Sequence, residues 1–369
     1  MEGMPMWTII ISAFLVAFAL CVIYLTIAVS RFGMFQKLSR GKGFVKYAIS
    51  FLIIALVSVG LTAVTSVVNA VIIGLHFAFF FLLFGIVMKI AEKRAKKACR
   101  VYWQGWLAIT VTILYLIIGA FQCYHIWQKD YSLQTQKNVG QIHFALIADA
   151  HLGTTFDGNG FREHLQKIQK QNPEFLLIAG DFVDDSTKRK DFEIACEALA
   201  EMNLKYGVWY AFGNHDAGYY GSRDFTANDI REIMGKNGIH VLEDAYELID
   251  DRFYIVGRRD GHDPGRQSIQ TLLSGLDQEK YVIVINHEPN DYDNEETSAA
   301  DLVVSGHTHG GQMFPWTALS KVVKADDLVY GHVSRGNVDF IVTSGISDWE
   351  ILFKTGTRSE YVMITVEGN

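Results

Sequence analysis

The chain has 369 residues, half of them apolar, and its 33 basic and 40 acidic residues leave a net charge of −7. The charges are unevenly divided, because residues 1–140 hold 13 Lys and Arg against 3 Asp and Glu, whereas residues 141–369 carry a net charge of −17. The negative charge of residues 141–369 excludes nucleic acid as their partner, since proteins bind phosphate backbones through basic surfaces. The mean hydropathy of +0.15 is high for a wholly soluble protein.

Residues 1–128 are predicted to form a transmembrane domain. Three stretches, 7–30, 47–88 and 101–127, contain no Asp, Glu, Lys or Arg. Each is long enough to cross the hydrocarbon of a bilayer, and the middle one is long enough to cross it twice with a turn near Asn69. The alternative, buried helices of a large soluble core, is disfavoured because such long uncharged runs are rare in soluble folds. We expect a four-helix transmembrane bundle with spans near 7–30, 44–65, 70–90 and 102–126.

Basic residues predict the orientation of this bundle. They gather after the first and third predicted spans, at Arg31, Lys37, Arg40, Lys42, Lys46, Lys89, Lys93, Arg94, Lys96, Lys97 and Arg100. Positively charged loops favour the cytoplasmic side of a membrane, so both chain termini are expected on the other side. The sequence therefore predicts an integral, multi-pass cell membrane protein, in contact with the lipid bilayer, whose residues beyond 128 are extracytoplasmic.

A second domain is predicted after a polar linker at residues 129–140. From residue 141 to residue 369, short apolar runs alternate with helical patterns, which is typical of a layered α/β domain. Only Cys196, one of four cysteines, lies in this part of the chain, so it has no internal disulfide framework.

Side chains that bind metals follow five of the apolar runs. The five segments are Asp149-Ala150-His151, Gly180-Asp181, Gly213-Asn214-His215-Asp216, Asn286-His287 and Gly306-His307-Thr308-His309. Ligand groups of α/β folds gather beyond the carboxyl ends of the strands, so these side chains are expected to meet at one edge. Any one of them alone would be read as a solvated loop residue. Together they predict a binuclear centre, which requires a bridging carboxylate and several nitrogen or oxygen donors.

In this order the segments resemble the motifs of the calcineurin-like metallophosphoesterases. The matching motifs are D-x-H at 149–151, G-D-x-x-D at 180–184, G-N-H-D at 213–216, a lone His at 287 and G-H-x-H at 306–309. The resemblance covers residues 141–369 and looks closest to the bacterial membrane-attached branch that includes the YkuE-like and YaeI-like proteins. It implies an α/β metallophosphoesterase domain, built as a layered β-sandwich flanked by helices.

The resemblance also implies a role for each motif residue. It assigns one metal to Asp149, His151 and His309, the other to Asn214, His287 and His307, and the bridge between them to Asp181. His215 is implied to stabilise charge on the phosphate and to protonate the leaving oxygen, with Asp184 as its orienting partner; for Asp184 the alternative is a carboxylate that caps a turn. Asp185 departs from the Arg that protein Ser/Thr phosphatases place there, which argues against a phosphoprotein substrate.

The predicted function is a membrane-anchored binuclear-metal phosphoesterase that hydrolyses a phosphomonoester or phosphodiester by metal-activated hydroxide attack. Its expected substrate is a membrane lipid or a cell-envelope compound, and its two divalent metal ions are expected to be Mn, with Fe and Zn as alternatives. Arg258 and Arg259 are candidates for substrate binding, against the alternative of surface charge. Two other functions remain open: an anchored extracytoplasmic nucleotide phosphodiesterase, and a non-catalytic metal-binding receptor or scaffold.

Overall fold

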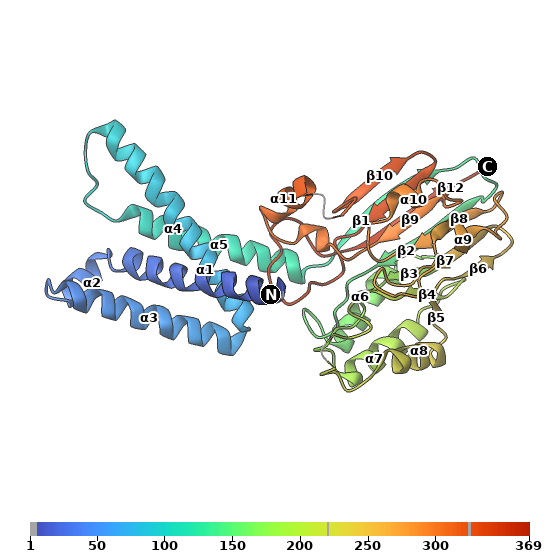
Figure 1. The fold of residues 1–369 in the computed structure, drawn as a ribbon, viewed down its shortest axis with the longest axis horizontal. Helices are drawn as coiled ribbons and strands as arrows, with labels where there is room; N and C mark the ends of the chain where they lie inside the picture. Colours follow the sequence, from blue (N-terminus) through green and yellow to red (C-terminus); the bar gives the residue numbers. More distant parts are fainter. Residues whose placement is uncertain (1–5, 220, 324–325) are drawn as a thin grey trace, which may run out of the picture. The chain divides into compact units, whose positions relative to one another are not determined.

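The computed structural model describes residues 6–219, 221–323 and 326–369, and the side chains within this part except those of residues 6–15 and 321–323. The chain separates into two compact units, with the division between Ile118 and Gly119 (Figure 1). The first unit is helical, and the second contains all the strands of the described chain.

The first unit consists of apolar helices. They are α1 (Met6–Val29), α2 (Gly33–Leu38), α3 (Gly43–Val64), α4 (Val67–Ala95) and α5 (Trp103–Tyr124), the last of which continues into the second unit. Among the described residues, α3, α4 and α5 are long and apolar enough to cross a membrane. The predicted span near 7–30 coincides with α1, but its described apolar stretch, Val16–Val29, is shorter than a span, so a count of four spans stays a prediction.

The turn between α3 and α4 lies slightly earlier than the expected position at Asn69. It falls at Thr65 and Ser66, and the Ser66 hydroxyl accepts a hydrogen bond of 3.2 Å from the backbone N–H of Asn69. A Ser side chain at this position satisfies one of the free N–H groups at a helix start, which explains why α4 begins there.

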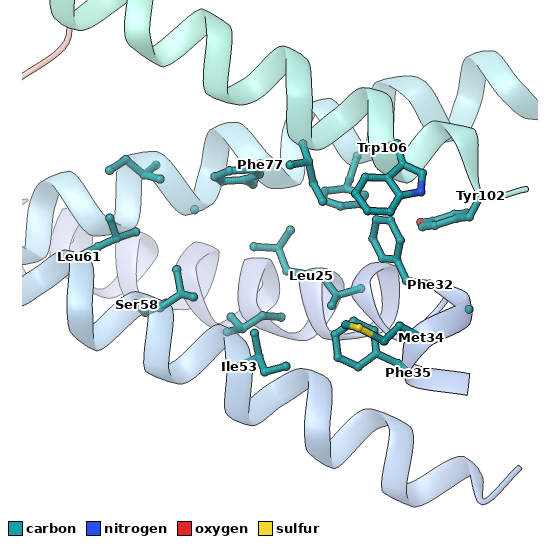
Figure 2. Close-up of a pocket in the computed structure, with 18 of the residues that line it drawn as sticks. Leu25, Phe32, Met34, Phe35, Ile53, Ser58, Leu61, Phe77, Tyr102 and Trp106 are labelled. Atoms are coloured by element: carbon teal, nitrogen blue, oxygen red, sulfur yellow. The ribbon is translucent and has the colours of Figure 1, made fainter. Parts of the chain in front are cut away.

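An apolar cavity of about 680 Å³ lies inside the first unit (Figure 2). Leu25, Ile53, Phe77 and Trp106 line it from α1, α3, α4 and α5, and among the described lining residues Arg100 alone is charged. At one end, the ring of Phe32 lies edge-on to those of Phe81, Tyr102 and Trp106, with centroids 5.0 to 6.5 Å apart. A lining of this kind suits hydrocarbon better than water, because it offers water few hydrogen-bond partners.

Two six-stranded sheets form the second unit. The first has the order β1-β12-β2-β3-β4-β5 and the second β10-β11-β9-β8-β7-β6. Strands β2 to β5 are parallel, as are β7, β8, β9 and β11, whereas β12 with β2, β6 with β7 and β10 with β11 pair antiparallel. The strands are β1 (Trp127–Gln134), β2 (Gln141–Ile147), β3 (Leu176–Ala179), β4 (Val208–Ala211), β5 (His240–Leu242), β6 (Ala245–Ile249), β7 (Phe253–Gly257), β8 (Tyr281–Ile285), β9 (Leu302–Ser305), β10 (Gly331–Arg335), β11 (Val338–Val342) and β12 (Glu360–Glu367).

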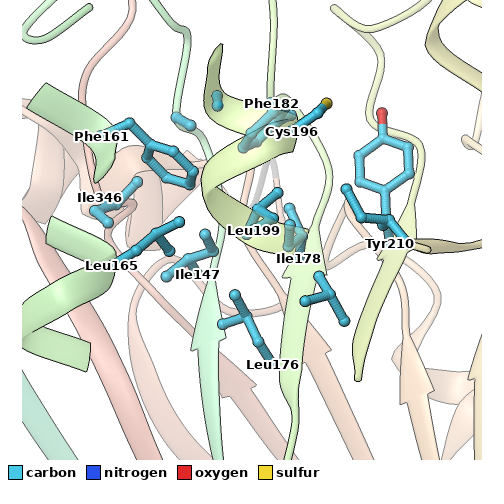
Figure 3. Packing of buried hydrophobic residues seen from close by; sticks show 14 of the residues in the cluster. Ile147, Phe161, Leu165, Leu176, Ile178, Phe182, Cys196, Leu199, Tyr210 and Ile346 are labelled. Atoms are coloured by element: carbon cyan, nitrogen blue, oxygen red, sulfur yellow. The ribbon is translucent and has the colours of Figure 1, made fainter. Parts of the chain in front are cut away.

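Helices cover the outer faces of the two sheets. On the first sheet lie α6 (Gly158–Gln169), α7 (Arg189–Ala200) and α8 (Ala227–Lys236), and α9 (Ile269–Leu273) and α10 (Tyr292–Glu295) pack on the second. Alternate residues of each strand point to opposite faces. In β3, Leu176 and Ile178 therefore pack under the helices (Figure 3), whereas Leu177 packs between the sheets. The result is an α/β domain with mixed sheets in the expected layered arrangement.

The predicted linker at residues 129–140 is wrong over its first half. Residues 127–134 form β1, which pairs in parallel with β12 along its whole length. β1 lies at the edge of its sheet and most of its side chains are at least partly exposed, so its sequence is polar and lacks the apolar pattern of a buried strand. Residues 135–140 alone join β1 to β2.

Candidate metal centre

The five segments predicted to meet at one edge all follow strands. They come after β2, β3 and β4 of the first sheet and after β8 and β9 of the second, so both sheets contribute to one site. A hydrogen bond of 2.7 Å between His287 Nδ1 and the carbonyl oxygen of Ala179 ties the end of β8 to the end of β3. Parallel strands end at the same edge, which explains why residues far apart in the chain come together here.

Asp149, His151 and His309 form the first of two donor groups. One potential ligand atom from each lies within 4.8 Å of the others, and all three residues are buried. Both ring nitrogens of His151 are buried without a hydrogen-bond partner. Such groups cost free energy unless something else binds them, and a divalent cation at this position would bind one of the two nitrogens.

Asp181, His287 and His307 form the second donor group, again with ligand atoms within 4.8 Å of one another. Asn214 joins it, because its Oδ1 lies 3.1 Å from His287 Nε2 and 2.9 Å from His307 Nδ1. Since His287 Nδ1 donates to a carbonyl oxygen, its Nε2 carries a lone pair in the neutral ring. A carboxylate oxygen, an amide oxygen and an imidazole lone pair thus face one another, an arrangement suited to a cation.

Asp181 lies between the two groups. Its Oδ2 is 3.1 Å from His287 Nε2 and 3.7 Å from His151 Nε2, while its Oδ1 accepts a hydrogen bond of 2.9 Å from the backbone N–H of His215. Burial would raise the pKa of this carboxyl group, but the neighbouring His287 outweighs that effect and lowers it. Burial would lower the pKa of His287, but the neighbouring Asp181 carboxylate outweighs this effect and raises the pKa to about 10. A bound cation would replace the proton that this pair otherwise shares.

Five of the candidate ligands have a left-handed backbone. The φ angles are 54° for Asp149, 36° for His151, 50° for Asp181, 71° for His307 and 48° for His309. Residues with a side chain seldom adopt this conformation, which costs about 1–2 kcal/mol, and such strained residues cluster at functional sites. The turns that follow the strands therefore position these donors even without a ligand.

Asp216 is a residue of the site that sequence reasoning did not assign. Its fully buried carboxylate accepts hydrogen bonds from the backbone N–H groups of Asp181 (2.8 Å), Val183 (3.1 Å) and Gly213 (2.7 Å). Burial raises its pKa to about 6. Asp216 thus joins the turn after β3 to the turn after β4. In the sequence, its place at the end of the G-N-H-D motif is the one feature that indicates a role in the site.

A buried ion pair behind His309 was also missed. Asp348 Oδ1 lies 3.4 Å from His309 Nδ1 and 3.1 Å from Lys354 Nζ, and both Asp348 and Lys354 are fully buried. Lys354 Nζ also donates to the carbonyl oxygen of Ser344. The carboxylate can orient the imidazole of His309, as carboxylates commonly do for metal-binding histidines. In the sequence, a lone Lys after an apolar run reads as a surface residue.

The structure does not pair Asp184 with His215. Asp184 Oδ1 accepts hydrogen bonds of 2.7 Å from both the backbone N–H and the hydroxyl of Ser186, and Oδ2 lies 3.6 Å from His151 Nδ1. Within the described residues, Asp184 makes no hydrogen bond to His215. Burial would raise the pKa of Asp184, but His151 and Ser186 lower it to about 2. Its carboxylate is occupied by the turn that it caps, which was the alternative.

His215 lies beside His151 of the first donor group and Asp181 of the second. It is half-buried, and its ring centroid is 5.1 Å from those of His151 and Tyr219 and 5.2 Å from that of Trp349. Burial lowers its pKa, although Asp181 acts in the opposite direction. The hydroxyl of Tyr219, another residue that sequence reasoning missed, lies 2.7 Å from Asn214 Nδ2.

The structure contradicts Arg258 as a substrate-binding residue. Its side chain is buried, and Nη1 donates to Asp291 Oδ2 at 2.7 Å and to Glu295 Oε1 at 2.8 Å. Arg259 is more exposed and pairs with Asp263 at 3.1 Å, which fits the alternative of surface charge. Two neighbouring carboxylates hold the buried Nη1 of Arg258, and the side chain is only 2% exposed, so it is not available to a phosphate.

Comparison with known proteins agrees with the geometry of the site. Residues 142–311 match the family described as calcineurin-like phosphoesterase. A metallophosphoesterase of Campylobacter jejuni is 28% identical over 270 residues, which cover 71% of this chain and 68% of that protein. A transmembrane protein with a metallophosphoesterase domain from Danio rerio is 27% identical, with 63% of this chain and 54% of that protein covered. The metallophosphoesterase YkuE of Bacillus subtilis is 26% identical over 170 residues, which cover 45% of this chain and 58% of that protein.

Proposed function

We propose that this chain, whose residues 142–311 match the calcineurin-like phosphoesterase family, is a membrane-anchored binuclear-metal phosphoesterase acting on a phosphomonoester or phosphodiester. The observation that carries this proposal is the pair of donor groups that meet at Asp181, each with ligand atoms within 4.8 Å of one another. The cluster combines imidazole, carboxylate and amide donors, which suit Mn, Fe and Zn, and we propose Mn.

The donors divide between two cations in this proposal. Asp149, His151 and His309 would hold one, Asn214, His287 and His307 would hold the other, and Asp181 would contribute to both. When bound, two divalent cations lower the pKa of a water molecule and neutralise charge on a phosphate. Asp348 faces one ring nitrogen of His309, and the Ala179 carbonyl accepts from one ring nitrogen of His287, which leaves the other nitrogen of each ring for a cation.

His215 is the proposed proton donor. It lies beside both donor groups without belonging to either, and Asp181 fixes the start of its turn by accepting its backbone N–H. From this position the imidazole can donate a hydrogen bond to a phosphate oxygen and then a proton to the leaving oxygen. Because Asp184 is bound to Ser186, the packing of His215 against Trp349 and Tyr219 takes the place of an orienting carboxylate.

The proposed substrate is a phosphoester of the membrane or the cell envelope. Three apolar helices of spanning length support anchorage, and anchorage raises the effective concentration of substrates in the same membrane. The basic residues between α1 and α3 and between α4 and α5 favour a cytoplasmic location for those loops. The metallophosphoesterase domain then lies on the extracytoplasmic side.

The proposal is tested with the purified full-length protein in detergent. Metal content and hydrolysis of bis-p-nitrophenyl phosphate, cyclic nucleotides and a membrane lipid extract are measured together. We expect metal-dependent hydrolysis that Asp181→Asn removes and that Asp250→Asn, a change at an exposed turn, leaves intact. A preference for soluble nucleotides over every lipid would replace the substrate with a nucleotide. Bound metal without turnover of any ester would support a binding protein instead.

A further inference from the structure

The second unit exposes large apolar side chains in one short segment. Phe314, Trp316 and Leu319, in and just before α11 (Trp316–Val323), are 60%, 53% and 44% exposed. Residues 312–320 contain no charged side chain. Ser320 is buried, whereas Trp316 and Leu319, three residues apart, share the outward face of the helix. We call Phe314, Trp316 and Leu319 the apolar surface of α11; contiguous apolar patches on a domain mark interaction sites.

This surface lies at the end of the unit where α5 finishes. The backbone N–H groups of Lys354 and Ser359 donate to the carbonyl oxygens of Gly119 and Gln122 in the last turns of α5, at 3.0 and 2.9 Å. The next residue after Lys354 in the same loop, Thr355, donates its N–H to the Gln312 carbonyl at 2.9 Å. It also accepts a hydrogen bond of 3.2 Å from the N–H of Phe314. One loop therefore joins α11 to the end of α5, and Figure 1 shows α11 at that end of the unit.

The end of a membrane-spanning helix lies at the boundary between acyl chains and headgroups. Aromatic side chains favour that boundary, and two exposed ones, Phe121 and Tyr124, occupy the last turn of α5. A neighbouring uncharged helix that presents Trp and Leu outward has the composition of one that lies in the interface. Its occupant is thus a lipid bilayer and not a soluble protein.

The same surface borders the candidate metal centre. The short 3₁₀ helix His309–Gly311 carries a candidate ligand and leads directly into residues 312–319. A second exposed apolar residue of the site is Trp349, whose half-exposed ring has its centroid 5.2 Å from that of His215. Apolar side chains thus follow one candidate ligand directly along the chain, and another lies beside the proposed proton donor.

We propose that the apolar surface of α11 inserts into the membrane interface beside α5, and that the substrate is a lipid phosphoester taken directly from the bilayer. The insertion rests on the geometry of the surface and on α5 as a membrane-spanning helix, whereas the identity of the substrate rests on the proposed phosphoesterase function. The two parts are therefore tested separately.

Insertion is tested by spin labels on the full-length chain in nanodiscs of phosphatidylethanolamine and phosphatidylglycerol. A label at Leu319→Cys is compared with one at Leu248→Cys, which is 40% exposed on β6 at an edge of the second sheet, with the exposed Cys99 replaced by Ser. We expect the label at 319 to collide with oxygen dissolved in lipid and to be shielded from an aqueous nickel chelate, and the label at 248 to show the reverse. Equal access to nickel would overturn insertion. Shielding from both reagents would mean that protein, such as a second copy, covers the surface, which also overturns it.

Substrate access is tested with Trp316→Ser/Leu319→Ser, against Tyr246→Ser/Leu248→Ser as the matched pair of exposed apolar residues on β6. Hydrolysis of lipid in vesicles is expected to fall roughly tenfold in the first variant only, because each tenfold step corresponds to about 1.4 kcal/mol of lost interaction. Hydrolysis of bis-p-nitrophenyl phosphate is expected to be unchanged in both. An equal loss on the two substrates would overturn direct access from the bilayer. A wild-type chain that hydrolyses neither would contradict the proposed function and leave the depth measurement standing.

Discussion

The imidazole of His287 shows how closely single residues are constrained at the site. Its Nδ1–H is bound to the Ala179 carbonyl, and its Nε2 faces Asp181 and Asn214. Gly180, next to Ala179, has a φ of +77°, and a Cβ built there would lie 2.6 Å from His287 Nδ1. The absence of a side chain at 180 is therefore a condition for the position of the imidazole.

We predict that Gly180→Ala weakens metal binding and lowers stability more than Gly238→Ala does. Gly238 has a similar φ of +73° but no atom within 4 Å of its built Cβ, so it reports backbone strain alone. Strain is expected to cost about 1–2 kcal/mol in both variants, and crowding against His287 and the backbone of Gly213 adds about 1–3 kcal/mol in Gly180→Ala. Metal titration and thermal unfolding of the two proteins measure the difference. Equal behaviour would mean that the ring of His287 and the backbone of Gly213 move aside without consequence.

Among the elements, β2 and β3 show how local pattern and tertiary packing combine. Their side chains alternate between the layer under α6 and α7 and the layer between the sheets, as in Leu146 and Ile147 of β2. Helix α6 covers one of these layers with Phe161 and Leu165, and it places His164 at its partly exposed side against Phe156, with ring centroids 5.2 Å apart.

His164 is expected to make the second unit less stable in acid. Burial, together with the nearby charges of Lys167 and His125, lowers its pKa to about 4 from an ordinary value of 6.5. Between these two pH values the unfolded chain binds the proton and the folded chain does not, so stability falls as the pH decreases from 6.5 towards 4.

We predict that His164→Gln reduces this dependence. Unfolding midpoints of the metal-free full-length protein, measured from pH 7 to pH 4, are expected to fall less steeply in the variant than in the wild type. Removal of metal avoids the separate effect of protonating the candidate ligands. Parallel curves for the two proteins would show that His164 takes up its proton equally in the folded and unfolded chains.

The molecule as a whole joins two units whose surfaces differ in polarity. The first exposes large apolar side chains along its helices, such as Leu56 at 71% and Val59 at 68%, while the second keeps most of its apolar side chains in three cores. Exposed apolar surface along long helices is stable in lipid and costly in water. This contrast supports the proposal that the first unit is embedded in a bilayer.

The proposed orientation predicts which cysteines an impermeant maleimide reaches in intact cells. Cys99 is exposed in the basic loop between α4 and α5, which is expected in the cytoplasm. It should react only after lysis. A cysteine at Lys190→Cys, exposed on α7, in a Cys99→Ser chain should react before lysis. The reverse pattern would place the metallophosphoesterase domain in the cytoplasm.

The sequence by itself determined the features that depend on local chain properties. Long runs without charge identify apolar helices, because few charged side chains enter lipid. Ligand types such as Asp149, His151 and His309 stand directly after apolar strands, and parallel strands bring their ends together whatever lies between them in the chain. Layering of the α/β domain followed from the same alternation of strands and helices.

Tertiary structure alone decided the features that depend on contacts between distant segments. β1 pairs with β12, Lys354 is buried against Asp348, and Arg258 is bound by Glu295. In each case the first-named partner reads as polar surface in its own sequence. Asp184 was predicted to orient His215, and it binds Ser186 instead. The physical reason is that a polar side chain is directed by whichever partners the fold places within hydrogen-bond distance, and residue type and spacing do not contain that information.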